Sequence, residues 1–375
     1  MDIHEINKII NINKNPSDTK IVVAMSGGVD SSVVAVLLKK LGYQVIGITL
    51  QLYDHGDALK KKNACCAGVD IYDAKIVAEK YDFPHYVLNY QNNFKESVID
   101  DFVSSYLEGE TPIPCVKCNQ SVKFRDLLKV ARDLGADAMA TGHYVQRKIS
   151  SQNIAELHKA IDDGKDQSYF LFATTRQQLD FLRFPLGGFT KEYTRQLATE
   201  FGLEVASKPD SQDICFVPNG DYAEVIKKHR PNSFKIGDII HCQTKKILGQ
   251  HEGIINFTVG QRRGLKISYP EPLYVIKIDA QNNQILVGEE QFLNQQIFLI
   301  NNCNWLIEVK ESTKFNGKVR IRSNTEEQIA EIEILPNNFA KITMKSMTRA
   351  ITKGQAGVIY DGTKILGGGW ICEIL

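Results

Sequence analysis

Hydrophobic and polar residues follow one another over the first fifty positions in the pattern of a strand, a helix and a second strand. Residues 21–25 form an apolar run of strand length, residues 26–32 are small and polar, and residues 33–41 have apolar residues at the spacing of a buried helix. Gly42 closes that helix, and residues 43–50 are a second β-rich run. A βαβ unit of this kind predicts an α/β fold with a Rossmann-like parallel sheet.

The α/β pattern continues to about residue 218. It predicts helices at residues 70–80, 94–107, 121–134 and 190–201, a helix that opens at residues 165–171, and strands at residues 85–89 and 136–140. Residues 111–114, with the sequence TPIP, are predicted not to be helical, because proline removes a backbone donor and restricts the residue before it.

Beyond residue 220 the pattern changes to short β-like runs separated by glycine turns. These runs lie at residues 237–240, 251–253, 257–264, 273–278, 284–287, 317–321, 329–334, 340–344, 357–360 and 365–366. Strands at such spacing predict a small barrel. We therefore expect three domains: an α/β catalytic domain at residues 1–218, a small central β-rich domain at 219–281, and a C-terminal β-barrel at 282–375.

The loop between the first strand and the first helix has the composition of an anion site. Gly27 and Gly28 let a ligand approach the backbone, Ser26 and Ser31 supply hydroxyls, and the first amides of the helix point into the loop. The loop is not a Walker loop, because no Gly-Lys-Ser/Thr follows, and it lacks the three spaced glycines of a dinucleotide fingerprint. The alternative is an ordinary glycine turn that joins a strand to a helix.

Composition narrows the class of protein. The 375 residues are 43% hydrophobic and 24% charged, with a net charge of +1, and no apolar run is long enough to span a membrane. The N-terminal residues have no hydrophobic signal core, so we expect a cytoplasmic protein without a membrane partner. With so small a net charge, a nucleic-acid partner must be met by a local basic patch.

Cysteine is the second source of candidate chemistry. Eight cysteines in a cytoplasmic chain favour thiol or metal chemistry over a disulfide framework. Only Cys115 and Cys118 have C-x-x-C spacing, and no second pair completes a four-thiolate zinc site, so zinc is the minor alternative. Cys118 lies next to Lys117, shortly before the helix predicted at 121–134, and both features lower a thiol pKa. Cys242, Cys303 and Cys372 are expected to be ordinary buried cysteines.

Several short motifs occur in a fixed order along the chain: SGGVDSS, TPIPCVKCN, TGHY, KDQSYFL, DSQDICF, TVGQRRGL, KGQAG and LGGGW. SGGVDSS is similar to the pyrophosphate loop of the ATP pyrophosphatase superfamily. The whole series, from residue 20 to the C-terminus, resembles the bacterial tRNA-specific 2-thiouridylase family. That resemblance implies ATP-dependent adenylation of the C2 oxygen of the wobble uridine of tRNA, followed by sulfur transfer to give 2-thiouridine, AMP and pyrophosphate.

The resemblance also implies residue roles. It implies an ATP site, with Mg²⁺, formed by Ala24, Met25, Ser26, Gly27, Gly28, Val29, Asp30, Ser31, Leu50 and Gly142. Asp30 would help to place the metal or the α-phosphate. The family's contacts to tRNA match His143, Lys165, Asp166, Gln167 and Gln355, with Arg322 and Ser323 near a further contact. Two of these assignments have a purely structural alternative. His143 could be a core histidine, and Arg322 and Ser323 could be ordinary strand-surface residues.

For sulfur transfer, the resemblance implies that Cys215 carries the persulfide and that Cys118 is the nucleophile, with a transient disulfide between them. The persulfide sulfur would come from a cysteine desulfurase or a relay protein. One position departs from the family pattern, because Cys115 stands where many members have an aspartate, so a carboxylate role cannot be carried over there. Cys65 and Cys66 could form a further redox or metal element, but bystander thiols in a loop are the simpler interpretation.

Three other functions remain open at this point. A ligase of the GMP or NAD synthetase kind would share the loop but would not need paired cysteines or a C-terminal barrel. A non-catalytic tRNA-binding or sulfur-relay protein would keep the loop only as a scaffold. A zinc-dependent RNA modifier would use Cys65, Cys66, Cys115 and Cys118 as ligands.

Overall fold

A computed structural model describes residues 3–53, 67–210, 214–217 and 220–375. The chain forms two compact units, each built from separate segments of sequence. The first unit comprises Met1–Ser97, Cys115–Pro218 and Thr363–Ile365, and the second comprises Val98–Pro114, Asn219–Gly362 and Leu366–Leu375. Within the described ranges, no helix combines the length and the apolar character that crossing a bilayer requires.

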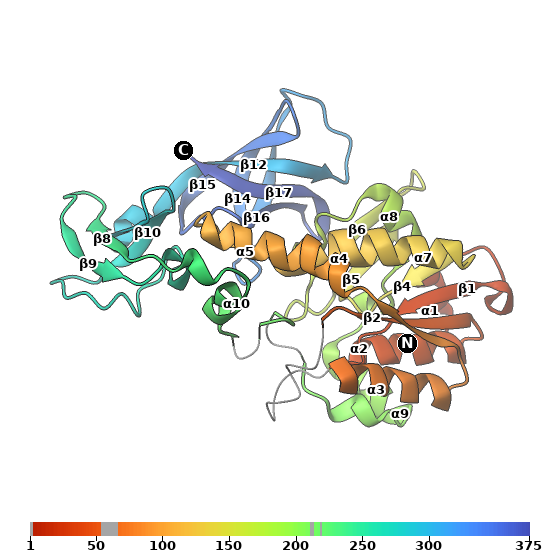
Figure 1. Cartoon of the computed structure of the whole chain (residues 1–375). Coiled ribbons are helices and arrows are strands. Elements are labelled where there is room, and N and C mark those ends of the chain that lie inside the picture. The colour runs from red at the N-terminus through yellow and green to blue at the C-terminus, as the bar shows by residue number, and fades with distance from the viewer. Residues whose placement is uncertain (1–2, 54–66, 211–213, 218–219) are drawn as a thin grey trace. The chain divides into compact units, whose positions relative to one another are not determined.

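The first unit is built on a parallel five-stranded sheet with the strand order β3-β2-β1-β4-β7. The strands are β1 (Lys20–Ala24), β2 (Gln44–Gln51), β3 (His85–Asn89), β4 (Ala138–Ala140) and β7 (Leu182–Arg183). The central strand β1 is apolar on both faces, and Ile21, Val22 and Val23 are completely buried, as expected for a strand covered by helices on both sides. Figure 1 shows α2, α3 and α9 along one face of this sheet and α7 on the other.

The helices of the first unit begin and end at residues that the local sequence explains. They are α1 (Ile3–Ile10), α2 (Val29–Lys40), α3 (Ala67–Lys80), α4 (Gln91–Phe94), α6 (Pro114–Lys117), α7 (Leu128–Asp133), α8 (Arg176–Phe181) and α9 (Lys191–Glu200). Thr175 and Gln178 form a capping box at the start of α8, and the Thr190 hydroxyl accepts the Tyr193 amide at the start of α9.

A hairpin that the sequence pattern did not predict follows the sheet. It consists of β5 (Val145–Ile149) and β6 (Ala155–Lys159). The 3₁₀ turn η5 (Pro185–Gly188) packs against it so closely that a Cβ on Gly187 would lie 1.8 Å from the carbonyl oxygen of Val145. Only glycine fits this contact.

The second unit contains the barrel. Its antiparallel strands are β12 (Asn294–Trp305), β13 (Lys314–Arg320), β14 (Gln328–Leu335), β15 (Phe339–Arg349), β16 (Ala356–Asp361) and β17 (Lys364–Ile374). They follow the order β12-β15-β14-β13-β16-β17, and β12 also pairs with β17, which closes the barrel. Alternate residues point inward, so that Ala330, Ile332 and Ile334 of β14 are buried in its core.

A smaller sheet in the second unit has the order β10-β11-β8-β9. Its strands are β8 (Gly237–His241), β9 (Ile247–His251), β10 (Tyr274–Asp279) and β11 (Gln284–Gly288), and two helices belong to the same unit, α5 (Asp100–Leu107) and α10 (Tyr222–His229). The predicted fold class, a Rossmann-like parallel sheet followed by a small β-rich part and a barrel, is confirmed. The predicted domain boundaries stay predictions.

Several sequence predictions were wrong in detail. Residues 257–264 contain no strand, and the helix expected at 165–171 is only the 3₁₀ turn η4 (Ser168–Leu171). Helix α10 was missed, although Asp221 caps its N-terminus by accepting the Glu224 amide. Residue 114 is helical after all, because Pro114 is the first residue of α6, a position where proline fits without losing a hydrogen bond.

Candidate active site

The loop between β1 and α2 is a tight turn fixed by its own hydroxyls. The Ser26 amide donates to Oγ of Ser31 at 3.1 Å, and the Ser31 hydroxyl donates to the Gly28 carbonyl at 3.4 Å. Gly27 has φ +71°, and a Cβ there would lie 2.0 Å from the backbone oxygen of Asp70. The turn therefore requires glycine, and it leaves the first amides of α2 at the loop, where they favour an anion.

Two other predicted nucleotide residues lie beside this loop. A Cβ on Gly142 would be 3.0 Å from the Ser31 amide nitrogen and 3.0 Å from Cβ of Asp30, so Gly142 borders the start of α2. Leu50 lies near the end of β2, which pairs in parallel with β1. The structure thus brings together the predicted ATP residues from three strand ends, the edge at which open α/β sheets bind ligands.

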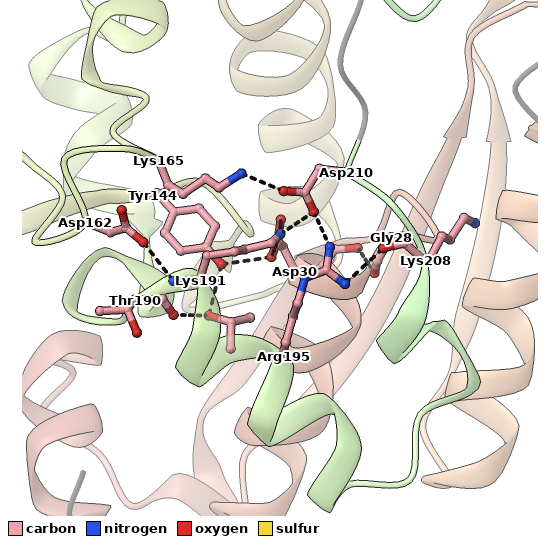
Figure 2. Close-up of polar contacts among 12 residues, drawn as sticks. Gly28, Asp30, Tyr144, Asp162, Lys165, Thr190, Lys191, Arg195, Lys208 and Asp210 are labelled. Atoms are coloured by element: carbon pink, nitrogen blue, oxygen red, sulfur yellow. Dashed lines mark hydrogen bonds and ion pairs between the residues drawn. The ribbon is translucent and has the colours of Figure 1, made fainter.

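Asp30 is held by a buried lysine. The Lys191 ammonium contacts both carboxylate oxygens of Asp30, at 2.7 and 2.8 Å, and the Tyr144 hydroxyl donates to the same carboxylate at 2.9 Å (Figure 2). Lys191 is 9% exposed, and Thr190 caps the helix that it begins. Burial and the Asp30 charge raise the pKa of Tyr144, so this hydroxyl stays a donor. Asp30 is therefore positioned before any nucleotide binds.

Asp210 joins three cations around the same point. Its carboxylate accepts from Lys165 at 2.8 Å, Lys191 at 2.9 Å and Arg195 at 2.8 Å (Figure 2). Burial by itself would raise the pKa of Asp210, but the hydrogen bonds from Lys165 and Lys191 lower it to about 2. Asp210 is thus ionised at neutral pH and ties Lys165 to the Lys191–Asp30 pair.

A second cation, the half-buried Lys208, supports the loop from a distant part of the sequence. The Lys208 ammonium donates to the Gly27 carbonyl at 3.0 Å and pairs with Asp70 and Asp73, each at 2.6 Å. Sequence analysis gave no role to Lys191, Arg195, Lys208, Asp210 or Tyr144. The only available signal was the density of charged residues in KEYTR and SKPDS, which also suits an exposed surface.

The thiols differ from the prediction. Cys118 was expected just before a helix, with a lowered pKa, but it lies four residues into a continuous helical run that starts with α6 and continues as the π-helical stretch η3 (Cys118–Leu127). Its side chain is buried, and burial raises the pKa of the Cys118 thiol, with Lys123 opposing the shift. The prediction of a lowered pKa was therefore wrong, because desolvation exceeds the effect of the neighbouring cation.

Cys215 lies near Cys118 in the folded chain. Desolvation and the charges of Cys118 and Cys115 raise the pKa of the Cys215 thiol to about 12. The residue is nevertheless partly open to water, since it is classed with Cys115 among the exposed cysteines. The raised pKa keeps Cys215 a protonated thiol at neutral pH. Cys118 and Cys215, far apart in sequence, are within electrostatic range and are not joined by a disulfide.

Among the predicted tRNA contacts of the first unit, His143 follows β4 at the same edge of the sheet as the loop. The Nδ1 atom of His143 is 2.8 Å from the Thr141 hydroxyl, and the imidazole packs edge-on against Phe124 and Phe184. Burial holds the pKa of His143 well below its ordinary value, with Lys123 acting in the same direction, so the ring is neutral at pH 7.

The KDQ residues make specific contacts within the first unit. Lys165 binds Asp210, as described above. Asp166 accepts from the Ser168 hydroxyl at 2.6 Å, and the Gln167 side-chain oxygen accepts from the Tyr144 amide at 2.9 Å. Asp166 and Gln167 thus hold Ser168 and Tyr144 in place through side-chain hydrogen bonds.

The remaining tRNA contacts lie in the second unit. Arg322 donates to the Thr352 hydroxyl at 2.6 Å, and the Gln355 amide donates to the Thr352 carbonyl at 3.3 Å, so Thr352 brings these two residues together. Ser323 is exposed beside Arg322. Cys65 and Cys66 lie outside the described residues. In the described part of the chain, no group of three or more His, Cys, Asp or Glu side chains is arranged to hold a metal ion.

Comparison with known families decides between the functions left open by the sequence. Three family models match in succession: a "tRNA methyl transferase HUP domain" at residues 19–219, a "tRNA methyl transferase PRC-barrel domain" at 223–289 and an "Aminomethyltransferase beta-barrel domain" at 295–371. The tRNA-specific 2-thiouridylase MnmA of Rickettsia conorii is 61% identical over 365 residues, which is 97% of this chain and 98% of the relative. The chain belongs to the tRNA-specific 2-thiouridylase family.

A further relative agrees with this family. The 2-thiouridylase of Rickettsia canadensis is 62% identical over 361 residues, covering 96% of this chain and 98% of the relative. A solved structure of the U34-tRNA thiolase NcsA from Methanococcus maripaludis is 17% identical, covers 61% of this chain and 72% of that chain, and superposes with a TM-score of 0.38. The resemblance to 2-thiouridylases and the enzyme class inferred from it, a sulfurtransferase, are confirmed by the relatives of high identity.

Proposed function

We propose that this 2-thiouridylase family member activates the wobble uridine of tRNA with ATP at the loop that precedes α2 and then transfers sulfur through Cys118 and Cys215. The observation that carries the proposal is the convergence, in one compact unit, of an anion-binding loop and two thiols that are distant in sequence. A carbonyl oxygen of uracil is a poor leaving group, so sulfur can replace it only after activation.

In the first step the C2 oxygen of uridine attacks the α-phosphorus of ATP. A bond forms between that oxygen and phosphorus, and the bond between phosphorus and the bridging oxygen to the β-phosphate breaks, which releases pyrophosphate. The amides that open α2, with the Ser26 and Ser31 hydroxyls, are placed to bind the β- and γ-phosphates. The glycines of the loop leave room for this approach, because Gly28 has only the Ser26 hydroxyl within 4 Å of a Cβ position.

A magnesium ion fits this loop only with most of its ligands supplied by the nucleotide and water. Asp30 is the carboxylate in position to contribute, and its two oxygens already contact Lys191. The ion would supply charge neutralisation on the phosphates. In the chain itself, Lys191 and Tyr144 keep the Asp30 carboxylate oriented, and Lys191 would add a positive charge near the phosphates.

Sulfur transfer then uses the two cysteines. A desulfurase or a relay protein places a persulfide on Cys215. In one route its terminal sulfur attacks C2, AMP leaves, and the Cys118 thiolate attacks Sγ of Cys215, breaking the sulfur–sulfur bond and leaving the thiocarbonyl on the base. In the other route Cys118 attacks Sγ of Cys215 first and releases hydrosulfide, which attacks C2. Both routes end in a Cys118–Cys215 disulfide, which a reductant reopens with two electrons.

The proposed tRNA contacts are His143, Lys165, Asp166, Gln167, Arg322, Ser323 and Gln355. A neutral His143 can exchange hydrogen bonds with a base, and its ring offers a surface for stacking. Lys165 reaches the same Asp210 that pairs with Lys191. Binding of tRNA at Lys165 and binding of a nucleotide at the loop are therefore linked through the carboxylate of Asp210.

The decisive test is tRNA thiolation by the purified chain with ATP, Mg²⁺ and either sulfide or a desulfurase. We expect Cys118→Ser and Cys215→Ser to abolish 2-thiouridine, measured by nucleoside analysis, while Cys115→Ser retains it as the matched control. An active Cys118→Ser with an inactive Cys115→Ser would reassign the nucleophile. Pyrophosphate release by all three variants would show that the adenylation step does not need the thiols.

A further inference from the structure

A cavity of about 330 Å³ in the first unit is lined by both polar and apolar residues, three of them basic. It lies among α1, β5 and the segment around η5, and its lining includes Lys8, Gln146, Arg147, Lys148 and Phe184. The volume is near the lower end of ligand sites in proteins, enough for a small charged group. The close packing of Gly187 on Val145 brings the η5 segment against β5 at this point.

Three basic residues line this cavity, and the carboxylate that acts on Arg147, that of Asp180, lies outside the lining. Arg147 donates from Nε to the Leu179 carbonyl at 2.8 Å, but its Nη1 is buried without a hydrogen-bond partner among the described residues. Lys8 and Lys148 are exposed, and within the described ranges neither makes an ion pair. None of the lining residues is acidic. A buried donor without a partner costs stability, so an acceptor that reached Nη1 of Arg147 would be favoured.

A fourth cation lies within electrostatic range of Arg147. Arg183 is 5% exposed and donates to the carbonyls of Ile10, Asp180 and Leu182. Burial, followed by the charge of Arg147, lowers the pKa of Arg183 to about 9, and burial lowers the pKa of Arg147, with Asp180 opposing. The two guanidinium groups thus repel each other in a partly dry environment, and a bound anion would relieve that repulsion.

The cavity adjoins the proposed tRNA contact of the first unit. Phe184 lines the cavity and also packs edge-on against His143, with ring centroids 6.4 Å apart. Arg147 follows His143 by four residues, which at the rise of an extended chain is at most about 13 Å. A nucleotide next to a base at His143 could therefore place its phosphate at the cavity.

We propose that this cavity, with Lys8, Arg147 and Lys148 around it, binds a backbone phosphate of the tRNA whose target base lies beside His143. The inference rests on the proposed role of His143 as a tRNA contact. The planar guanidinium of Arg147 suits a phosphate, since its donors match two phosphate oxygens. With a net charge of only +1, the chain needs such local sites to hold RNA.

The test measures the affinity for unmodified tRNA between 50 and 200 mM salt. Two variants remove the site: Arg147→Gln, and a Lys8→Gln/Lys148→Gln double variant whose exposed positions leave the fold intact. Each is expected to reduce the slope of log affinity against log salt by roughly 0.7 to 0.9 and to weaken binding about fivefold at 150 mM salt. Lys75→Gln is the matched control, because Lys75 is exposed and its ion pair in the described part of the chain is with Glu79, its neighbour on the same helix, and its slope should equal that of the wild type.

A parallel titration with inorganic phosphate distinguishes the source of the anion. A loss of phosphate-dependent thermal stabilisation in the double variant, with an unchanged tRNA slope, would assign the cavity to a free phosphate and overturn the tRNA assignment. Unchanged slopes and unchanged stabilisation would overturn the site altogether. His143→Gln is measured alongside: if it alone weakens tRNA binding, only the phosphate site fails, and if only the cavity variants weaken binding, the role of His143 fails while the cavity stands.

Discussion

The charged cluster around Asp30 and the thiols of Cys118 and Cys215 belong to the same compact unit. The first is a set of paired charged side chains, and the second is a pair of uncharged thiols. Lys191 forms ion pairs with both Asp30 and Asp210, at 2.7 and 2.9 Å. Cys118 and Cys215 have raised pKa values and remain protonated thiols. Desolvation acts at both places, but only the first has counter-charges within hydrogen-bond distance.

This difference suggests an order of events. On the proposed function, the nucleotide end is assembled in the free protein, because Lys191 already contacts both Asp30 and Asp210. On the same proposal, the sulfur end stays unreactive until something changes its surroundings. Such an arrangement would protect the thiols from oxidation while no tRNA is bound, since the thiolate is the form that reacts.

The largest effect is expected from removing the centre of the charged cluster. Lys191→Met leaves Asp30 and Asp210 without their shared cation, and breaking a buried pair in this way costs about 3–5 kcal/mol. We expect pyrophosphate release in the presence of tRNA and ATP to fall roughly 100-fold or more. Lys75→Met, at an exposed lysine of the same unit, is the control, and activity within twofold of the wild type for Lys191→Met would contradict the role of the cluster.

The next effect concerns the thiols. At pH 8 a thiol with a pKa near 8.5 is about one quarter thiolate, whereas the raised pKa values leave far less at Cys118 and Cys215. We expect iodoacetamide to alkylate both at least about tenfold more slowly than free cysteine, with rates that still rise above pH 9.5. Peptide mass analysis separates the two sites. A plateau below pH 8 at Cys118 would restore the activated thiolate expected from the sequence.

A smaller effect is expected from neutralising Asp210, the carboxylate that joins Lys165 to Lys191 and Arg195. Asp210→Asn keeps the shape of the side chain but removes the charge that faces Lys165, Lys191 and Arg195. Thiolation should fall about tenfold, with KM rising for both ATP and tRNA, because one carboxylate serves both contacts. An increase confined to the KM for ATP would separate Lys165 from the nucleotide loop.

The smallest effect concerns stability at mildly acidic pH. The pKa of His143 is lowered in the folded state, so the unfolded chain binds the proton more tightly, and stability is complete above pH 6.5 and lost as pH falls below it. Between pH 6.5 and 5.5 the loss from this residue should be about 1 kcal/mol. Urea unfolding of the wild type and His143→Gln isolates it, since other histidines contribute equally to both. Parallel curves for the two proteins would show that His143 is not desolvated.

The sequence predicted those features that are coded by neighbouring residues. The apolar run at residues 21–25, the small polar loop and the buried helix follow one another directly in the sequence. For this reason β1, the loop and α2 were all recognised. The barrel was predicted from strands with clear alternation, such as β14. In β12 the sequence NQQIFLINNCNW mixes asparagine and glutamine with the inward residues, which hid a twelve-residue strand.

What could not be predicted depends on contacts between distant residues. Lys191 and Asp30 are 161 positions apart, and nothing local distinguishes Lys191 from an exposed lysine. The pKa of Cys118 was mispredicted for the same reason, because the neighbouring lysine is visible in the sequence and the burial is not. The β5–β6 hairpin was missed because its strands, VQRKI and AELHK, carry many polar residues.

The start of strand β17 bears on how the protein folds during its synthesis. Thr363, Lys364 and Ile365 belong to the first unit, where Lys364 pairs with His158 of β6 and with the carboxylate of Glu156. These residues are separated from the rest of the first unit, which ends at Pro218, by the segment 219–362, and they are therefore synthesised well after it. The amino-terminal half, although synthesised first, cannot finish folding during translation, so a truncated product released early would carry an unfinished nucleotide loop domain.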